Sequence, residues 1–287
     1  MHGRRNILMK KYSREDLTDK LYPIEDPFLT GLPNTWYTQT QKFSDTDLFT
    51  RAADYWFKSS KLNKLRNWDQ FGCVDVIMGC THYIESIILK YGWDGFQILP
   101  QEYGYYGLMG KTGTPYKDLK PNTPLIVSLP NFSYADVRPE WDELLLICEE
   151  RNIDIHIDFA WLTVANGVDI DVGHPNIKSF AMSLSKYCCQ WNRIGLRWSR
   201  QRSMDSVTIM TRYYGDVNSG LISCGNFLIH RIPRDYAWTY YGKMYSQICE
   251  DLDLIPTKLI NVVKIKGQDK PMGIGQLLSS MHHANQA

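Results

Sequence analysis

From about residue 74 onward, the pattern of hydrophobic and polar positions alternates between strand-like and helix-like segments. Short apolar runs at 74–79, 96–100 and 124–130 predict buried strands, and apolar residues at helical spacing predict helices at 81–92 and 138–152. Further apolar runs at 177–185 and 193–199 predict two more strands. Strands that alternate with helices indicate an α/β fold in which helices cover both faces of a mainly parallel sheet.

The segment 153–161, IDIHIDFAW, predicts another strand. Its isoleucines point to one face, while Asp154, His156 and Asp158 point to the other. Ligands of such sheets collect beyond the carboxyl ends of the strands. Four residues fall at or just after predicted strand ends, namely Gly79, Asn131, Asp158 and Ser183. We therefore expect them to share one site.

Two helices carry recognisable boundary signals. Segment 45–60 begins with a Ser/Asp pair suited to a helix N-cap, and Gly92 is suited to end the helix at 81–92. Pro139 suits the first turn of the helix at 138–152, in which Trp141, Leu144, Leu145 and Cys148 share a face. The first 70 residues are otherwise rich in aromatic and turn-forming residues.

Composition narrows the class of protein. The chain has 287 residues, 44% of them hydrophobic and 22% charged, and its net charge of +1 provides no broad field for nucleic acid or an anionic membrane. No apolar run approaches a membrane span, and the N-terminus lacks the apolar core of a signal peptide. Seven cysteines without paired C-x-x-C spacing favour free thiols. We therefore expect a cytoplasmic protein.

Two candidate chemistries receive little support. The stretch YGYYGLMGKT resembles a phosphate-binding loop, but Tyr105 stands where that loop needs a glycine. Asp154, His156 and Asp158 could present metal ligands from one strand face. No spacing fixes a fourth ligand, so polar residues on a wetter face explain the pattern as well.

Pyridoxal phosphate (PLP) makes four demands that the chain can meet. Its aldehyde needs a lysine, and its pyridine nitrogen needs a carboxylate; Lys186 and Asp158 are candidates. Its phosphate needs backbone amides at a helix start, hydroxyls and an arginine. The candidates for that role are Gly79, Cys80, Thr81, Ser183 and Arg193, and PQEYGYYG offers rings for stacking. Taken singly, each is also an ordinary surface or capping residue.

The ordered set of motifs resembles the class I/II aminotransferases, the aspartate-aminotransferase-like members of the fold type I PLP-dependent enzymes. The match runs from about residue 75 to 199. MGCTHYIESII is similar to the family's glycine-rich turn before a helix, which implies that Gly79, Cys80 and Thr81 bind the phosphate. ILPQEYGYY implies that Tyr103 stacks on the cofactor ring.

The remaining motifs extend the resemblance. The run from SLPNFSY to DFAW implies that Asn131 lies beside the cofactor's phenolic oxygen and Asp158 on its pyridine nitrogen. SFAMSLSKYCCQWNRIGLRW resembles the family's lysine segment. It implies that Ser183 and Arg193 bind phosphate, and that Lys186 forms the Schiff base with the cofactor and serves as the general base.

The chain also departs from the family pattern. Trp161 replaces the usual tyrosine beside the cofactor, with an indole N–H as the possible donor, and NFSY replaces Asn-Pro-Thr-Gly. Only 88 residues follow Ser199, fewer than the family's closing domain. That domain carries the arginine that binds a substrate carboxylate. Arg212, Arg231 and Arg234 are candidates for this role, and each also fits an ordinary surface charge.

The resemblance implies a seven-stranded, mostly parallel sheet with helices on both faces and a reduced small domain. We divide the chain into an N-terminal arm and small-domain part (1–70), a large PLP-binding domain (71–205), and the rest of the large domain with a reduced C-terminal domain (206–287). The expected function is amino-group transfer from an amine or amino acid to a keto acceptor. A PLP-dependent lyase or decarboxylase and a non-catalytic homologue remain alternatives. The resemblance also implies a homodimer, to which the segment around Trp36 and Tyr37 could contribute.

Overall fold

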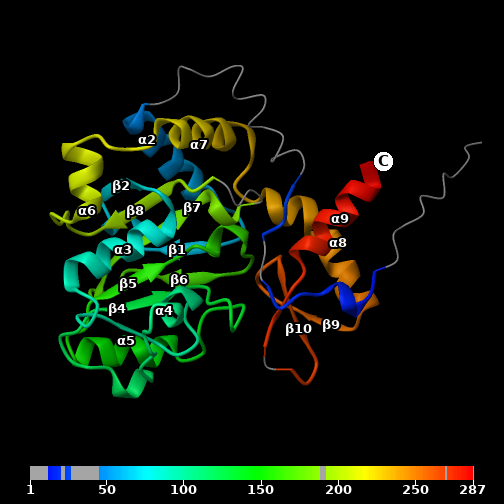
Figure 1. Cartoon of the computed structure of the whole chain (residues 1–287), viewed down its shortest axis with the longest axis horizontal. Coiled ribbons are helices and arrows are strands. Elements are labelled where there is room, and N and C mark those ends of the chain that lie inside the picture. Colours follow the sequence, from blue (N-terminus) through cyan, green and yellow to red (C-terminus); the bar gives the residue numbers. More distant parts are fainter. Residues whose placement is uncertain (1–11, 21–22, 27–44, 188–191, 269, 287) are drawn as a thin grey trace, which may run out of the picture.

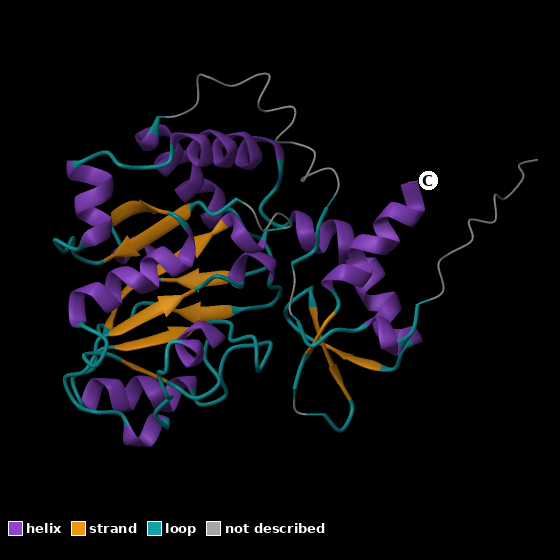
Figure 2. Ribbon diagram, in the orientation of Figure 1, coloured by secondary structure: helices purple, strands orange, loops and turns teal. Residues whose placement is uncertain are grey.

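The computed structural model describes residues 12–20, 23–26, 45–187, 192–268 and 270–286, with side chains through residue 281. A six-stranded sheet forms the centre of the larger lobe (Figures 1 and 2). Five of its strands run parallel, and β8 alone runs antiparallel to both of its neighbours. In spatial order the strands are β2 (Cys73–Ile77), β8 (Gly195–Ser199), β7 (Ile177–Ser183), β5 (Ile155–Asp158), β4 (Leu125–Ser128) and β3 (Gln97–Ile98).

The mainly parallel sheet is confirmed, whereas the expected seventh strand is absent from the described residues. The chain between β3 and β4 forms the short helix α4 (Gly104–Leu108) and the 3-10 turn η3 (Tyr116–Asp118). No described segment pairs with the outer edge of β3. The glycine- and proline-rich stretch at 104–124 explains this, because proline cannot donate to a strand ladder and glycine weakens a strand.

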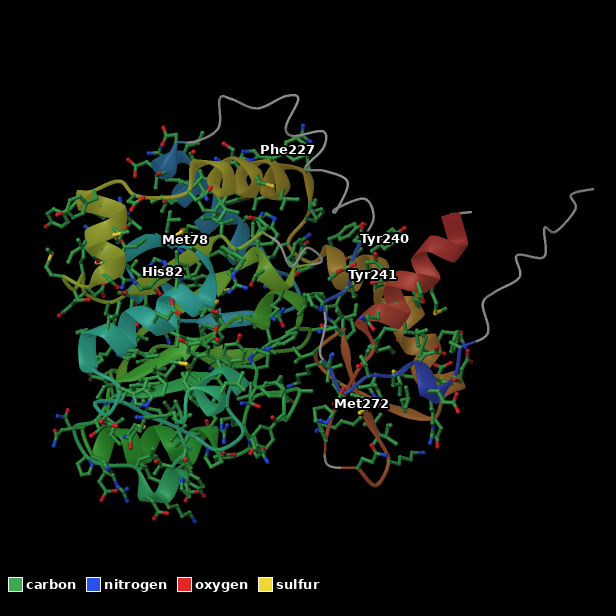
Figure 3. The ribbon with its side chains drawn as sticks, viewed as in Figure 1. Met78, His82, Phe227, Tyr240, Tyr241 and Met272 are labelled. Carbon is green, nitrogen blue, oxygen red and sulfur yellow. The ribbon has the colours of Figure 1, made fainter. Side chains whose placement is uncertain are left out.

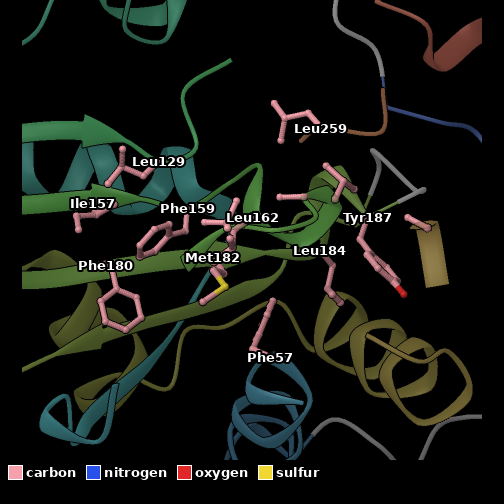
Figure 4. Close-up of a cluster of buried hydrophobic side chains, with 14 of the residues drawn as sticks. Phe57, Leu129, Ile157, Phe159, Leu162, Phe180, Met182, Leu184, Tyr187 and Leu259 are labelled. Atoms are coloured by element: carbon pink, nitrogen blue, oxygen red, sulfur yellow. The ribbon is translucent and has the colours of Figure 1, made fainter. Parts of the chain in front are cut away.

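Helices cover both faces of the sheet. Helix α3 (Gly79–Tyr91) packs on β2, β7 and β8 from one side, and α2 (Thr46–Lys58) packs on β2 and β8 and against α7 (Ser219–Arg231). Figure 4 shows Phe57 pointing from α2 toward the strand that carries Phe180 and Met182. Phe180 stacks on Trp198 of the next strand with ring centroids 5.4 Å apart, which fills the core between these layers.

The predicted helix boundaries are largely confirmed. Asp45 caps α2 by accepting from the backbone N–H groups of residues 47 and 48, and Gly92 ends α3 with a φ of 77°. Helix α5 (Trp141–Glu150) begins two residues after Pro139, because Glu140 has a non-helical ψ of 12°. The proline therefore lies in the turn before the helix rather than in its first turn.

The C-terminal segment forms a smaller lobe. Strands β9 (Leu254–Pro256), β10 (Val262–Ile265) and β11 (Met272–Gly273) form an antiparallel sheet beside α8 (Tyr236–Asp251) and α9 (Gly275–Gln286) (Figure 1). The N-terminal segment joins this lobe through a bridge between Thr18 and Gly273. The lobe is therefore built from both ends of the chain. The domain boundaries themselves stay a prediction.

Short elements complete the described chain. Strands β1 (Lys64–Arg66) and β6 (Asp169–Asp171) form a separate parallel pair. The short helices and turns are η1 (Arg14–Asp16), η2 (Trp68–Gln70), η4 (Leu162–Val164), η5 (Leu184–Lys186), α6 (Ser206–Thr208) and η6 (Ile209–Tyr213). In the described parts of the chain, every cysteine is a free thiol and no helix is long and apolar enough to cross a membrane. Cys188 and Cys189 lie outside the described residues.

Candidate active site

The turn from β2 into α3 forms one wall of the candidate site. Gly79 begins α3 with a φ of +81°, a backbone conformation that is strained in residues that have a side chain. The backbone N–H of Met78 donates to Nδ1 of His82, both labelled in Figure 3. At the third residue of the helix, the Thr81 hydroxyl accepts from the Arg193 guanidinium at 3.0 Å. A hydroxyl and a cation therefore meet at the start of a thirteen-residue helix, where backbone N–H groups also favour anions.

Asp158 ends β5 and is buried at the base of the site. Its Oδ1 accepts from the backbone N–H of Ala160 at 2.9 Å. Burial raises the pKa of this carboxyl above its ordinary value, against the lowering effects of that N–H, the Cys80 thiol and Lys186. The pKa of the buried Cys80 thiol is raised well above its ordinary value, chiefly by burial, so it stays protonated. A cationic N–H group beside Asp158 would offset the cost of its buried charge.

Lys186 ends η5, just after β7, and is partly buried. Its Nζ lies 4.7 Å from the centre of the Trp161 ring. Burial lowers the pKa of this amine, Arg193 lowers it further, and Asp158 opposes the shift. More of the amine is therefore neutral at a given pH than for an exposed lysine. A neutral amine is the form that attacks a carbonyl carbon.

These side chains share one cavity of about 390 Å³. Seven of the ten predicted site residues line it: Cys80, Thr81, Tyr103, Asp158, Trp161, Lys186 and Arg193. The other lining residues are Asp19, Gly104, Ser128, Phe132, Ser133, Ala160, Ser185, Lys270 and Pro271. The smaller lobe thus contributes to the wall through residues from both chain ends.

The other three predicted residues lie outside the cavity wall. Gly79 contributes backbone only. The Ser183 side chain is fully buried, and its hydroxyl pairs with that of Ser185 at 2.8 Å, so Ser185 is the serine that reaches the cavity. The Asn131 side chain donates to the Gln101 carbonyl and accepts from the Ser133 N–H. Asn131 therefore shapes the loop that carries Phe132 and Ser133 to the cavity.

Sequence reasoning missed a buried ion pair next to the site. Arg138 donates to Glu102 at 3.2 Å, and both side chains are at most 2% exposed. The other carboxylate oxygen accepts from the backbone N–H of Ser128. Burial raises the pKa of Glu102 to about 7, although the Ser128 hydrogen bonds and the Arg138 charge lower it. Because Glu102 adjoins Tyr103, the pair joins two cavity-lining segments.

Other missed residues differ in how visible they are in the sequence. Ser128 ends the observed strand β4 but lies inside the strand predicted at 124–130, so the strand-end rule did not mark it. Ser185 lies beside Lys186 and carried the same signal as Ser183. Lys270 carries no signal, because only the packing of the smaller lobe brings it to the cavity, where it lies 3.8 Å from Asp19.

None of the three arginines suggested for a substrate carboxylate lines the cavity. Arg212 donates to Asp75 and to the backbone of Val74. Arg231 lies over the Phe227 ring at 3.6 Å. Arg234 is buried and donates to the carbonyls of residues 162 and 163. Arg212 and Arg234 therefore connect segments of the fold, whereas Arg231 is an exposed charge that lies over a ring of its own helix.

The D-x-H-x-D strand separates into three environments. Asp154 pairs with Lys178 at 3.3 Å, His156 bonds to Ser179, and Asp158 faces the candidate site. Within the described parts of the chain, no three His, Cys, Asp or Glu side chains group as metal ligands.

The residues present fit PLP. A nucleophilic amine and a buried carboxylate share one cavity, and hydroxyls from Thr81 and Ser185 with the Arg193 guanidinium provide donors for a phosphate. The volume also lies within the range of small-molecule sites, roughly 300–1,000 Å³. The donor set thus meets each of the cofactor's chemical demands.

No protein-family model and no curated protein sequence matches the chain. Its fold does match solved structures. A PLP-bound C-S lyase from Staphylococcus hominis superposes with a TM-score of 0.61 at 11% identity, covering 86% of this chain and 75% of that one. An alanine aminotransferase from Pyrococcus furiosus superposes with a TM-score of 0.59 at 13% identity, covering 94% of this chain and 88% of that one. An L-threonine-O-3-phosphate decarboxylase from Porphyromonas gingivalis superposes with a TM-score of 0.52 at 13% identity, covering 86% of this chain and 85% of that one.

Proposed function

We propose that this chain, which has the fold of PLP-dependent aminotransferases and lyases, is itself a PLP-dependent enzyme. One observation carries the proposal. Lys186, whose pKa is lowered by burial, lines the same cavity as the buried Asp158 carboxyl and the Arg193–Thr81 pair. A binding module would need none of these groups together, whereas PLP chemistry needs all of them.

Each residue has a defined part in holding the cofactor. Thr81, Ser185 and Arg193 would bind the phosphate, and Asp158 would pair with the protonated pyridine nitrogen. Tyr103 and Trp161 provide aromatic faces for the ring. When bound, PLP supplies an aldehyde for amino groups and a ring that accepts electron density from a bond broken at the substrate's α-carbon.

Lys186 is the proposed catalytic residue. Its Nζ would hold the cofactor covalently until an amine substrate replaces it. The released amine would then take the substrate's α-proton and return a proton during the same turnover. Because burial lowers the pKa of Lys186, the neutral, proton-accepting form is more accessible than in an exposed lysine. Asp158 would keep the ring nitrogen protonated through this transfer.

We favour transamination, in which an amino group passes to a keto acceptor. The structural neighbours also include a C-S lyase and a decarboxylase, so a lyase acting on an unusual amine is the second candidate. The residues of the cavity wall also support a lyase as the second candidate. Lys270 is the smaller lobe's cation on the described wall, in place of an arginine with its two-pronged geometry.

The test is a visible absorption spectrum of the full chain with added PLP, before and after borohydride reduction. We expect an absorption band, and reduction should fix the cofactor to Lys186, as located by peptide mapping. The Lys186→Ala variant should lose the fixed label. The exposed Lys266, paired with Asp253, provides the control Lys266→Ala, which should retain it. A folded wild-type chain without a band would refute the proposal.

Amino acids added without a keto acceptor separate the two reaction types. A transaminase converts its cofactor once and stops, so product equals the amount of enzyme. A lyase or decarboxylase continues to release product. A product concentration far above the enzyme concentration would therefore refute transamination and favour a lyase or decarboxylase.

We also propose a cytoplasmic homodimer, on the resemblance and on the free thiols. Trp36 and Tyr37, the residues suggested for the subunit contact, lie outside the described residues. Light scattering coupled to size-exclusion chromatography tests the stoichiometry. A mass of a single 33.4 kDa chain would contradict the dimer.

A further inference from the structure

A second cavity, of about 310 Å³, lies farther along α3 from the candidate active site. The first cavity takes Cys80 and Thr81 from the start of α3, and the second takes Tyr83, Lys90 and Tyr91 from farther along it. Among the described residues, none lines both cavities. The second cavity is also lined by residues near the amino ends of β5 and β7, at the opposite edge of the sheet from Asp158.

A buried hydrogen-bond chain lines this second cavity. The hydroxyls of Tyr83 and Ser179 lie 2.7 Å apart, and the Ser179 hydroxyl lies 2.7 Å from Nδ1 of His156. Tyr83 is 1% exposed and His156 is 7% exposed. Nε2 of His156 has no hydrogen-bond partner within the described residues. Such an orphaned buried atom is costly, so a ligand or water is expected to satisfy it.

One arrangement of protons along this hydrogen-bond chain places a hydrogen on Nε2 of His156. Burial raises the pKa of Tyr83, so its phenol keeps its proton. In the arrangement in which this phenol donates to Ser179, the serine hydroxyl is left to donate to Nδ1 of His156. Burial together with nearby cations lowers the pKa of His156 to about 3, so the imidazole is neutral. A neutral imidazole that accepts at Nδ1 carries its proton on Nε2. In this arrangement His156, which lines the cavity, carries on Nε2 an N–H that is buried and has no partner among the described residues.

The charge around the cavity selects an anion. Five cationic side chains line it, against two carboxylates: Lys90, Lys178, Arg197, Arg200 and Arg202 against Asp154 and Asp205. Arg197 is 3% exposed, and its Nε has no partner within the described residues although its other nitrogens bond to Asp75 and Asp205. The surplus of positive charge is suited to a ligand with several negative charges, and two of the lining residues, His156 and Arg197, also hold buried nitrogens without partners among the described residues.

We propose that this second cavity binds a small organic anion carrying two or more negative charges, with His156 and Arg197 as buried donors and Lys90 and Lys178 as cations. The volume fits a compact metabolite rather than a nucleotide cofactor. A phosphate ester and a polycarboxylate share this chemistry. The proposal does not depend on PLP binding, because no lining residue is common to the two cavities.

The test is calorimetric titration of the full chain, at constant ionic strength, with pyrophosphate and citrate as probes. We expect saturable binding of at least one probe, and the preferred probe tells a phosphate from a carboxylate ligand. The Lys90→Ala/Lys178→Ala variant should weaken binding about tenfold or more. Lys178 pairs with Asp154 at 43% exposure. Lys258 pairs with Asp136 at 38% exposure and lies outside both cavities, so Lys258→Ala is the matched control and should bind normally.

Two further variants locate the site. His156→Phe keeps a ring but removes the donor, and should also weaken binding. Arg193→Ala removes a phosphate donor of the first cavity only, so it should leave unchanged the probe binding that the Lys90→Ala/Lys178→Ala variant loses. The proposal is overturned if neither probe saturates wild type in the millimolar range, or if the double lysine variant binds like wild type. Loss of binding in Arg193→Ala would also overturn it, by assigning the probe to the first cavity.

Discussion

Replacing Arg138 by methionine should destabilise the protein, and the cost should grow with pH. Arg138 is 3% exposed and bonds to Glu102, Glu140 and the Pro100 carbonyl. Methionine fills much of the same volume but makes none of these bonds. With each net hydrogen bond worth about 1 kcal/mol, the loss near pH 6 should be about 3 kcal/mol.

The pH dependence follows from Glu102. Its pKa in the folded protein is raised to about 7 from an ordinary 4.5, so the folded state keeps a proton that the unfolded state releases. Wild-type stability therefore falls as pH rises from 4.5 to 7, and this group causes no further loss above 7. Without Arg138 the pKa of Glu102 rises further, and the loss continues above 7. The added cost is about 1.4 kcal/mol per pH unit until the new pKa is reached.

Urea unfolding monitored by tryptophan fluorescence at about pH 6 and about pH 8 measures both the loss of stability near pH 6 and the added loss at higher pH. Arg138→Met should lose about 1 kcal/mol more at the higher pH than at the lower one. The Glu102→Gln/Arg138→Met double variant should lose this pH dependence, because glutamine has no proton to release while its carbonyl can still accept from the Ser128 N–H. An equal cost at both pH values would refute the inference that the charge of Arg138 holds down the pKa of Glu102.

Three further predictions test the cavity and the core. Arg193→Ala should weaken PLP binding about 10- to 100-fold in spectroscopic titrations, because it removes a charged donor; Arg231→Ala, outside the cavity, should not. Gly79→Ala should cost about 1–2 kcal/mol in urea unfolding, because alanine is strained at a φ of +81°; an unchanged midpoint would contradict this. In thermal unfolding, replacing the fully buried Leu144 by alanine should lower the free energy of unfolding by about 2–5 kcal/mol. Replacing Leu146, which is 65% exposed, should change it by no more than about 0.5 kcal/mol. Equal costs would show that α5 turns a different face to the core.

Much of the candidate site was predictable because parallel strands end at one edge. Asp158 ends β5 and Lys186 follows β7, so local sequence and sheet geometry bring them together. The same rule does not say which of two neighbouring hydroxyls faces inward. Ser183 is the last residue of β7 and is buried, whereas Ser185 lies in the η5 turn and lines the cavity. Side-chain direction after a strand end depends on that turn, which the alternating pattern does not encode.

The sequence by itself determined the strands, the principal helices and the order of motifs, because hydrophobic periodicity and caps act over a few neighbouring residues. Only the tertiary structure decided which polar groups are satisfied. Glu102 pairs with Arg138, and Lys270 lines the first cavity, only because segments distant in the chain pack together. The same packing leaves Nε2 of His156 without a partner among the described residues. Burial and partner geometry set the charge and reactivity of such groups, and both arise only when the layers pack.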